Sequence, residues 1–288
     1  MGPRDPPAAS GCEIAHLGGP LQDAPHVAVG LFVGRDATME IDRSFARVVA
    51  GQGQVRPSVV SIEQPAEVAG APLHVLRGVE RVLHAEAVRR GIASETILRR
   101  GIDPHVEIVT AAEKHGSDVI VMGRRGKRGL MQRMIGDATT KVVGRARCSV
   151  LVVPEGAGMW QERILLATDG SRFSDAAAVA AAKIAGLCKL AVTVISTVRD
   201  SFSEERAAQA DEAAKRIHDH FAERGIEVDM VVLRGNPEKL ILETAAERGA
   251  DLIVMGTHGR TGWERVMVGS VAESVIGESK IPVLAVKL

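Results

Sequence analysis

An internal repeat constrains the fold more than any other feature of this chain. Residues 114–123 read Lys-His-Gly-Ser-Asp-Val-Ile-Val-Met-Gly, and residues 247–256 read Glu-Arg-Gly-Ala-Asp-Leu-Ile-Val-Met-Gly. At the same offset of 133 residues, Gly126 corresponds to Gly259 and Gly136 to Gly269, without a gap. Similarity at a fixed offset predicts that the chain contains two copies of one folded unit.

Apolar runs of strand length alternate with amphipathic runs of helix length through most of the chain. We expect strands at 27–33, 59–62, 93–98, 119–122 and 149–153 in the first copy, and at 164–168, 190–197, 227–233, 251–255 and 281–287 in the second. Helices are expected at 73–91, 106–115 and after Gly136, then at 174–187, 203–224, 237–248 and 270–278. Strands that alternate with helices form right-handed βαβ units, so we predict the α/β class with two tandem doubly wound, mostly parallel sheets.

Length and composition divide the chain into domains. A length of 288 residues suits about two domains. We place the first domain at 26–154 and the second at 160–288, joined by a short linker at 155–159. Residues 1–25 carry five prolines and no periodic apolar pattern, which predicts a flexible N-terminal leader. Residues 34–72, interrupted by glycine and proline, show no clear pattern beyond the strand at 59–62.

Composition excludes several classes of partner. Lys and Arg together number 36, as do Asp and Glu, so no net charge attracts nucleic acid or an anionic membrane. The chain has no Tyr and seven Phe and Trp residues, too few for platforms that stack single-stranded bases. Three cysteines without CxxC spacing indicate free thiols in a reducing compartment. No apolar run approaches the roughly 20 residues of a membrane span, so we expect a cytoplasmic protein.

The strand expected at 251–255 leads into a glycine-rich connection. Gly256 and Gly259 allow the backbone to turn sharply and a bulky ligand to approach it closely. Gly269 and Ser270 then open a helix, whose first N–H groups and positive dipole end suit a phosphate. A strand, a glycine loop and a helix N-terminus in this order predict a nucleotide-phosphate site.

These residues resemble the nucleotide motif of the universal stress protein family, which is Gly, two residues, Gly, nine residues, Gly, then Ser or Thr. Gly256, Gly259, Gly269 and Ser270 complete that motif, and Asp169 matches the acidic residue that the family carries just past its first strand. The resemblance covers 160–288 and 73–154. It implies five-stranded Rossmann-like sheets of order 3-2-1-4-5, similar to the adenine nucleotide alpha hydrolases. In that order Asp169 and Gly256 end neighbouring strands at the switch point, where ligands bind.

The resemblance also implies a ligand and a role for each site residue. The ligand is ATP, AMP or ADP, with Mg²⁺ as an optional companion. The adenosine end is assigned to Ala167, Thr168 and Asp169, with Met255 beside the base or ribose. The ribose and phosphates are assigned to Gly256, His258, Gly259 and Arg260, and the phosphates also to Gly269, Ser270 and Val271.

The first copy departs from this motif. Asp137 stands where the second copy has Ser270, and its carboxylate would cap the helix and repel a phosphate. The loop before it carries Arg124, Arg125, Lys127 and Arg128, which either offset that charge or form a solvated basic turn. No residue aligns clearly with Asp169, Asp36 being the nearest candidate. We therefore expect a degenerate first nucleotide site.

Three functions remain open. The resemblance favours a nucleotide-dependent regulator of the stress response. Slow ATP hydrolysis or autophosphorylation is an alternative, although no catalytic or metal-binding residues can be nominated and no GxxxxGK[ST], HExxH or GxSxG motif is present. A ligand-free interaction scaffold is the third.

The last strands suggest how the copies associate. Relatives pair through their final strand, and the apolar runs 150–153 and 283–286 suit such pairing. The resemblance therefore implies an intrachain pseudo-dimer, with a homodimer as a further option. The stress signal, the protein partner and the choice between ATP and AMP stay open.

Overall fold

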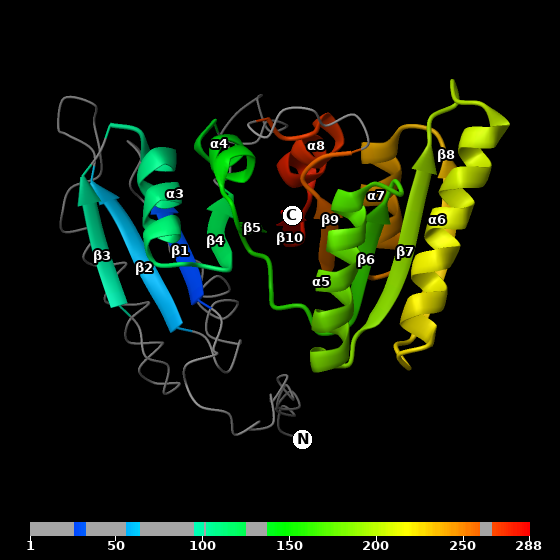
Figure 1. The fold of residues 1–288 in the computed structure, drawn as a ribbon, viewed down its shortest axis with the longest axis horizontal. Helices are drawn as coiled ribbons and strands as arrows, with labels where there is room; N and C mark the ends of the chain where they lie inside the picture. Colours follow the sequence, from blue (N-terminus) through cyan, green and yellow to red (C-terminus); the bar gives the residue numbers. More distant parts are fainter. Residues whose placement is uncertain (1–25, 33–55, 64–94, 101, 125–136, 260–266) are drawn as a thin grey trace, which may run out of the picture.

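A computed structural model describes residues 26–32, 56–63, 95–100, 102–124, 137–259 and 267–288, which form two halves of one sheet (Figure 1). The first half contains β1 (His26–Phe32), β2 (Arg56–Glu63), β3 (Glu95–Arg100), α3 (Pro104–Lys114), β4 (Val119–Arg124), α4 (Asp137–Arg145) and β5 (Ser149–Pro154). The second contains β6 (Arg163–Thr168), α5 (Arg172–Cys188), β7 (Ala191–Val198), α6 (Glu204–Ala222), β8 (Val228–Arg234), α7 (Pro237–Glu247), β9 (Leu252–Gly256), α8 (Ser270–Glu278) and β10 (Val283–Val286).

The ten strands lie in the order β3-β2-β1-β4-β5-β10-β9-β6-β7-β8. Each half therefore has the order 3-2-1-4-5, and its neighbouring strands are parallel. The halves meet where β5 and β10 pair antiparallel, with Leu151 opposite Leu284. The predicted α/β class and strand order are confirmed, and the expected pairing of the final strands occurs within the chain.

Two apolar layers cover the two faces of the sheet, and each layer runs across both halves. Alternate residues of a strand point to opposite faces, so Leu151 and Leu284 join the layer under α5 and α6, where Phe221 is fully buried. Val150 and Ala285 join the other layer, which packs against α3, α4, α7 and α8. The continuous core holds the two carboxyl edges of the sheet in a fixed relation.

Three helices of the second half begin at side chains that cap the helix. Ser171, Ser203 and Asn236 each accept a hydrogen bond from a backbone N–H three residues later, at the starts of α5, α6 and α7. Such caps satisfy N–H groups that have no partner within the helix. Gly269 precedes α8 and offers no side-chain cap. This helix therefore differs from the others at its N-terminus.

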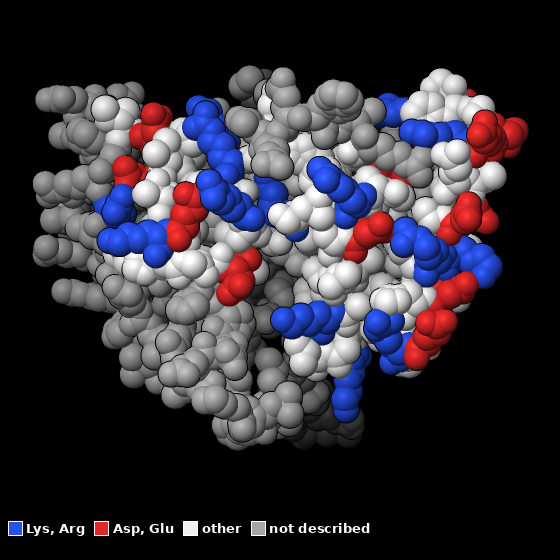
Figure 2. Space-filling view, in the orientation of Figure 1, with Lys and Arg blue, Asp and Glu red and all other residues white. Residues whose placement is uncertain are grey.

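Charges of both signs intermingle over α5 and α6 on the face that Figure 2 shows. Arg216 pairs with Asp175 at 2.7 Å, and Lys215 pairs with Asp219 at 2.6 Å. Exposed pairs of this kind contribute little to stability, but they break up any large basic patch over these two helices.

Some expectations lie outside the described residues: the leader at 1–25, the helix at 73–91 and most of 34–72. Elsewhere the observed elements begin and end within two residues of the predicted ones, except that β2 begins three residues earlier than predicted, at Arg56. None of the described helices is both long and apolar enough to cross a membrane. Among the residues that the structure describes, Cys148 and Cys188 form no disulfide.

Candidate functional site

Strands β6 and β9 separate at their carboxyl ends. They pair from Ile164 opposite Leu252 to Leu166 opposite Val254, whereas the later residues of β6 pair with β7 and those of β9 with β10. This divergence is the switch point of a doubly wound sheet, where ligands characteristically bind. A cavity of about 300 Å³ opens there.

Ten of the eleven predicted site residues line this cavity. They come from the ends of β6 and β9, the loop after β9 and the start of α8: Ala167, Thr168, Asp169, Met255, Gly256, His258, Gly259, Gly269, Ser270 and Val271. The eleventh, Arg260, lies outside the described residues. Segments almost 90 residues apart in the sequence thus meet around one cavity.

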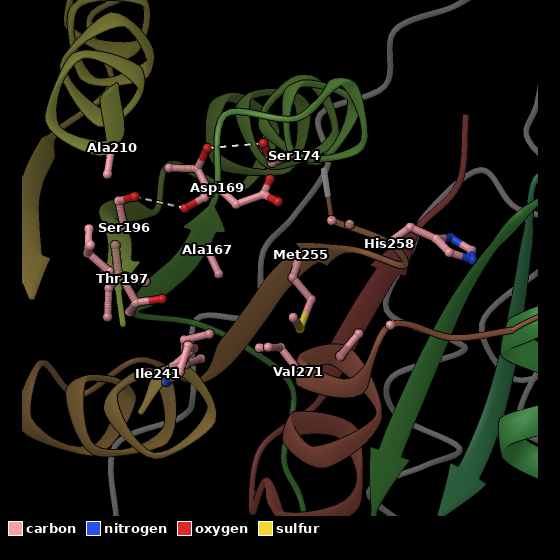
Figure 3. Close-up of a pocket in the computed structure, with 18 of the residues that line it drawn as sticks. Ala167, Asp169, Ser174, Ser196, Thr197, Ala210, Ile241, Met255, His258 and Val271 are labelled. Carbon is pink, nitrogen blue, oxygen red and sulfur yellow. Dashed lines mark hydrogen bonds between the residues drawn. The ribbon is translucent and has the colours of Figure 1, made fainter. Parts of the chain in front are cut away.

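Asp169 sits on a tight turn at the end of β6. Gly170 has a φ of 73°, a left-handed conformation that favours glycine, and the Ser171 N–H donates to Asp169 Oδ1 at 2.9 Å. The Thr168 hydroxyl accepts from the Gly170 N–H and donates to Ser174 Oγ, so this side chain holds the turn (Figure 3). The hydrogen bonds fix where the carboxylate lies.

The three motif glycines are required for space rather than for a special backbone angle, because none has a positive φ. The chain does bend directly after β9, at 257–258, but without a positive φ at Gly256 or Gly259. A Cβ at Gly256 would lie 2.8 Å from Phe173 Cβ and 2.9 Å from the Phe173 carbonyl carbon. A Cβ at Gly259 would lie 2.8 Å from Asp169 Oδ2. The missing side chain at Gly256 thus leaves room for helix α5, and the missing side chain at Gly259 leaves room for the Asp169 carboxylate.

The start of α8 faces the cavity with its backbone. The Gly269 N–H donates to the Thr257 carbonyl at 2.9 Å, and the first helical hydrogen bond runs from the Glu273 N–H to the Gly269 carbonyl. The amides of residues 270–272 precede that bond, and Gly269 at the N-cap provides no side-chain hydrogen bond to them. Such a helix end attracts an anion through its N–H groups and its dipole.

His258 lines the cavity, but Figure 3 shows its ring turned away from Asp169 and Met255. The ring lies 5.1 Å from the ring of Phe173, centroid to centroid. His258 Nδ1 is 2.9 Å from Thr257 Oγ1. These contacts place the imidazole beside the start of α5.

Sequence reasoning missed one wall of the cavity. Residues 195–198 at the end of β7, with Ala210 of α6 and Ile241 of α7, complete it, and Arg199 and Arg206 add two cations. The strand order contained a signal for them, because β7 is parallel to β6 and its carboxyl end reaches the same edge of the sheet.

The residue that follows Gly123 in the first half has a different use from its equivalent in the second. Arg124 ends β4 and donates hydrogen bonds to backbone carbonyls at the end of α8. Its guanidinium is therefore not part of a solvated basic turn, and that interpretation is wrong for this residue. Asp137 begins α4. The other loop cations and Asp36 lie outside the described residues.

Within the part of the chain that the structure describes, no three His, Cys, Asp or Glu side chains form a group that could hold a metal ion.

Comparison with known proteins gives matches over both halves. Residues 46–154 and 161–287 match the universal stress protein family. A universal stress protein of Methanocaldococcus jannaschii is 36% identical over 149 residues, which cover 47% of this chain and 87% of that protein. Another, from Mycobacterium tuberculosis, is 27% identical over 210 residues, covering 68% and 69%. The crystal structure of a universal stress protein from Archaeoglobus fulgidus covers 91% of this chain and 96% of its own, with a TM-score of 0.69 and 21% identity, and shares the fold.

Proposed function

This chain belongs to the universal stress protein family, which matches both of its halves, and we propose that its second half binds an adenine nucleotide, ATP or AMP. The protein would act as a nucleotide-dependent regulator in the stress response. The observation that carries the proposal is the cavity between β6 and β9, which brings Asp169 together with every position of the glycine motif.

The chemistry of the cavity suits the parts of such a ligand. Apolar side chains such as Ile195, Ile241 and Met255 form walls for a base. The carboxylate of Asp169 can accept hydrogen bonds from ribose hydroxyls, as acidic residues do in other doubly wound nucleotide sites. The amides at the start of α8, to which Gly269 offers no side-chain cap, and the exposed Ser270 suit phosphate oxygens. A volume of about 300 Å³ is at the lower end for small-molecule sites.

Regulation follows from where the ligand would touch the chain. A nucleotide in the cavity would contact Gly259, near the start of the connection between β9 and α8, and Gly269, at its end. We propose that a protein partner reads the occupied state at segment 257–268.

Calorimetry with ATP, ADP and AMP, with GTP for comparison, tests the proposal. We expect one adenine nucleotide per chain. Asp169→Ala should weaken binding about ten- to hundredfold, because a hydrogen bond to a charged group contributes roughly 1.5–3 kcal/mol. Asp175→Ala is the matched control, because Asp175 is only partly buried, pairs with Arg216 and does not line the cavity. The absence of binding, or equal binding by Asp169→Ala and the wild type, refutes the proposal.

The enzymatic alternative has less support. Among the lining residues that the structure describes, Asp169 is the single carboxylate, and its proposed role is to hold the ribose. His258 packs against Phe173 rather than facing Asp169. Neither side chain is placed as a general base for a water molecule at the start of α8.

A further inference from the structure

Arg124 links the first half to the helix that begins at the proposed phosphate site. Its guanidinium donates to the carbonyls of Ile276 at 3.0 Å and Ser279 at 2.6 Å, and also to that of Gly277. These carbonyls belong to the carboxyl end of α8 and the residue after it, where the helix supplies no N–H partner. Three carbonyls of the second half therefore depend on one side chain of the first.

The opposite contact is also present. Lys287, just after β10, donates through Nζ to the carbonyl of Gly144 at 2.8 Å, near the end of α4. Gly144 and Gly277 are equivalent positions of the repeat, so each half supplies a cation to the same helix of the other half. Burial lowers the pKa of Arg124 and of Lys287, because both charges are partly removed from water.

A cation at the end of α8 affects the whole of that helix. The positive charge complements the negative end of the helix dipole, and a guanidinium has enough donors to serve several carbonyls at once. With nine residues, α8 is about 13 Å long. Helices this short are marginal on their own, so the order of the first turn depends on how firmly the last turn is held.

In the repeat, Arg124 is equivalent to a residue of the proposed nucleotide loop. It follows Gly123, which matches Gly256, and so stands where the second half has Thr257. Thr257 lies in the proposed nucleotide loop. In the first half, the equivalent residue reaches across to the other half instead.

We propose that Arg124 is a positioning residue for the nucleotide site of the second half: it holds α8 at its carboxyl end, so that the amides at the start of α8 are aligned for phosphate. The inference rests on the proposed function and deepens it. The first half then sets the phosphate affinity of the second.

Arg124→Met tests the inference, because it keeps the long apolar stem and removes every donor. Arg124→Lys restores the charge but has fewer donors for the three carbonyls. Arg99→Met is the control: it breaks an ion pair with Glu107 (2.9 Å) that lies wholly within the first half. Lys287 is less suitable as a control, because it directly follows Val286, whose carbonyl accepts from the Thr257 N–H.

Three readouts separate positioning from general loss of stability. In the ligand-free protein, Arg124→Met should speed hydrogen exchange of the α8 amides about tenfold. Calorimetry should show ATP binding weakened about five- to tenfold, with adenosine binding changed by less than about twofold, because adenosine does not reach α8. For exchange rate and ATP affinity, Arg124→Lys should give values between those of wild type and Arg124→Met. If Arg124→Met does not fold, the comparison of Arg124→Lys with wild type tests the inference. Arg99→Met should match wild type in all three.

The outcomes that overturn the inference are distinct from failure of the proposed function. If wild type binds ATP and the Arg124 variants bind it equally well, the inference is wrong and the proposed function stands. If ATP and adenosine weaken together, or Arg99→Met has the same effect, Arg124 contributes only to stability. If wild type binds no adenine nucleotide, the proposed function fails, and the inference fails with it.

Discussion

Substitutions at Gly256 and Gly259 should separate the packing role of one glycine from the binding role of the other. At Gly256 a methyl group would meet the Cβ and carbonyl of Phe173 at 2.8–3.0 Å, on the first turn of α5. Backbone cannot rotate away, so β9 and α5 must move apart by about half an ångström. Overpacking of this kind costs about 1–3 kcal/mol. We expect Gly256→Ala to lower the melting temperature by roughly 2–12 °C.

At Gly259 the methyl group would meet only Asp169 Oδ2, at 2.8 Å, with Asp169 Cγ at 3.9 Å. The carboxylate can rotate at the expense of its 2.9 Å hydrogen bond from the Ser171 N–H, about 1 kcal/mol. Replacement of glycine by alanine returns about 0.4–1 kcal/mol through the unfolded chain, because φ is not positive here. Stability should change little, whereas ATP binding should weaken about tenfold or more because Asp169 is displaced.

Thermal unfolding and calorimetry with ATP measure the two effects on the same samples. Gly186→Ala is the control, because Gly186 lies in α5 with nothing within 4 Å of an added Cβ. It should raise the melting temperature slightly and leave binding unchanged. Equal destabilisation by Gly256→Ala and Gly259→Ala would refute the argument, and so would ATP binding by Gly259→Ala that equals wild type.

Other residues of the two halves give further predictions. The Asp251 carboxylate accepts the backbone N–H groups of Gln161, Glu162 and Arg163 at 2.5–3.1 Å, so Asp251→Asn should lower unfolding free energy by about 2–4 kcal/mol, measured by thermal unfolding, with unchanged ATP affinity. Burial raises the pKa of Cys148 to about 11. Above pH 9 the thiol ionises first in the unfolded chain, so the free energy of unfolding of wild type should fall by up to about 2–3 kcal/mol between pH 9 and 11 relative to Cys148→Ala. Parallel curves of stability against pH for the two proteins would contradict this. Asp137→Ser should raise the calorimetric ATP stoichiometry from one to two; two sites in wild type would end the degenerate-site hypothesis.

The periodicity of apolar residues predicted the strands and helices of the second half, and the family resemblance supplied the order of its strands in the sheet. β-Strands such as β9 are short apolar runs bounded by turn residues, and burial on both faces requires that pattern. The switch-point rule then placed Asp169 and Gly256 at one edge, where the cavity lies. Once the strand order is known, the positions of Asp169 and Gly256 at the ends of β6 and β9 are enough to predict that the two residues lie close together.

The physical reason for each glycine could not be predicted in this way. The motif spacing indicates where glycine is needed, but Phe173 lies 83 residues before Gly256, and only the packing of α5 against β9 reveals the contact. Ser270 and Asp169 were identified by resemblance, whereas the wall formed by residues 195–198 of β7 was missed because it carries no motif.

The contacts of Arg124 could not be predicted from the sequence either, because both interpretations of this residue considered only the loop that follows β4. Its partners lie more than 150 residues later. The antiparallel pairing of β5 with β10 explains the contact: α8 leads into the start of β10, and that start lies beside the end of β5. The carboxyl edge of one half is therefore the place where the phosphate helix of the other half ends. If Arg124 positions α8 as proposed, a substitution at the end of β4 in the first half would change the site of the second half through that helix.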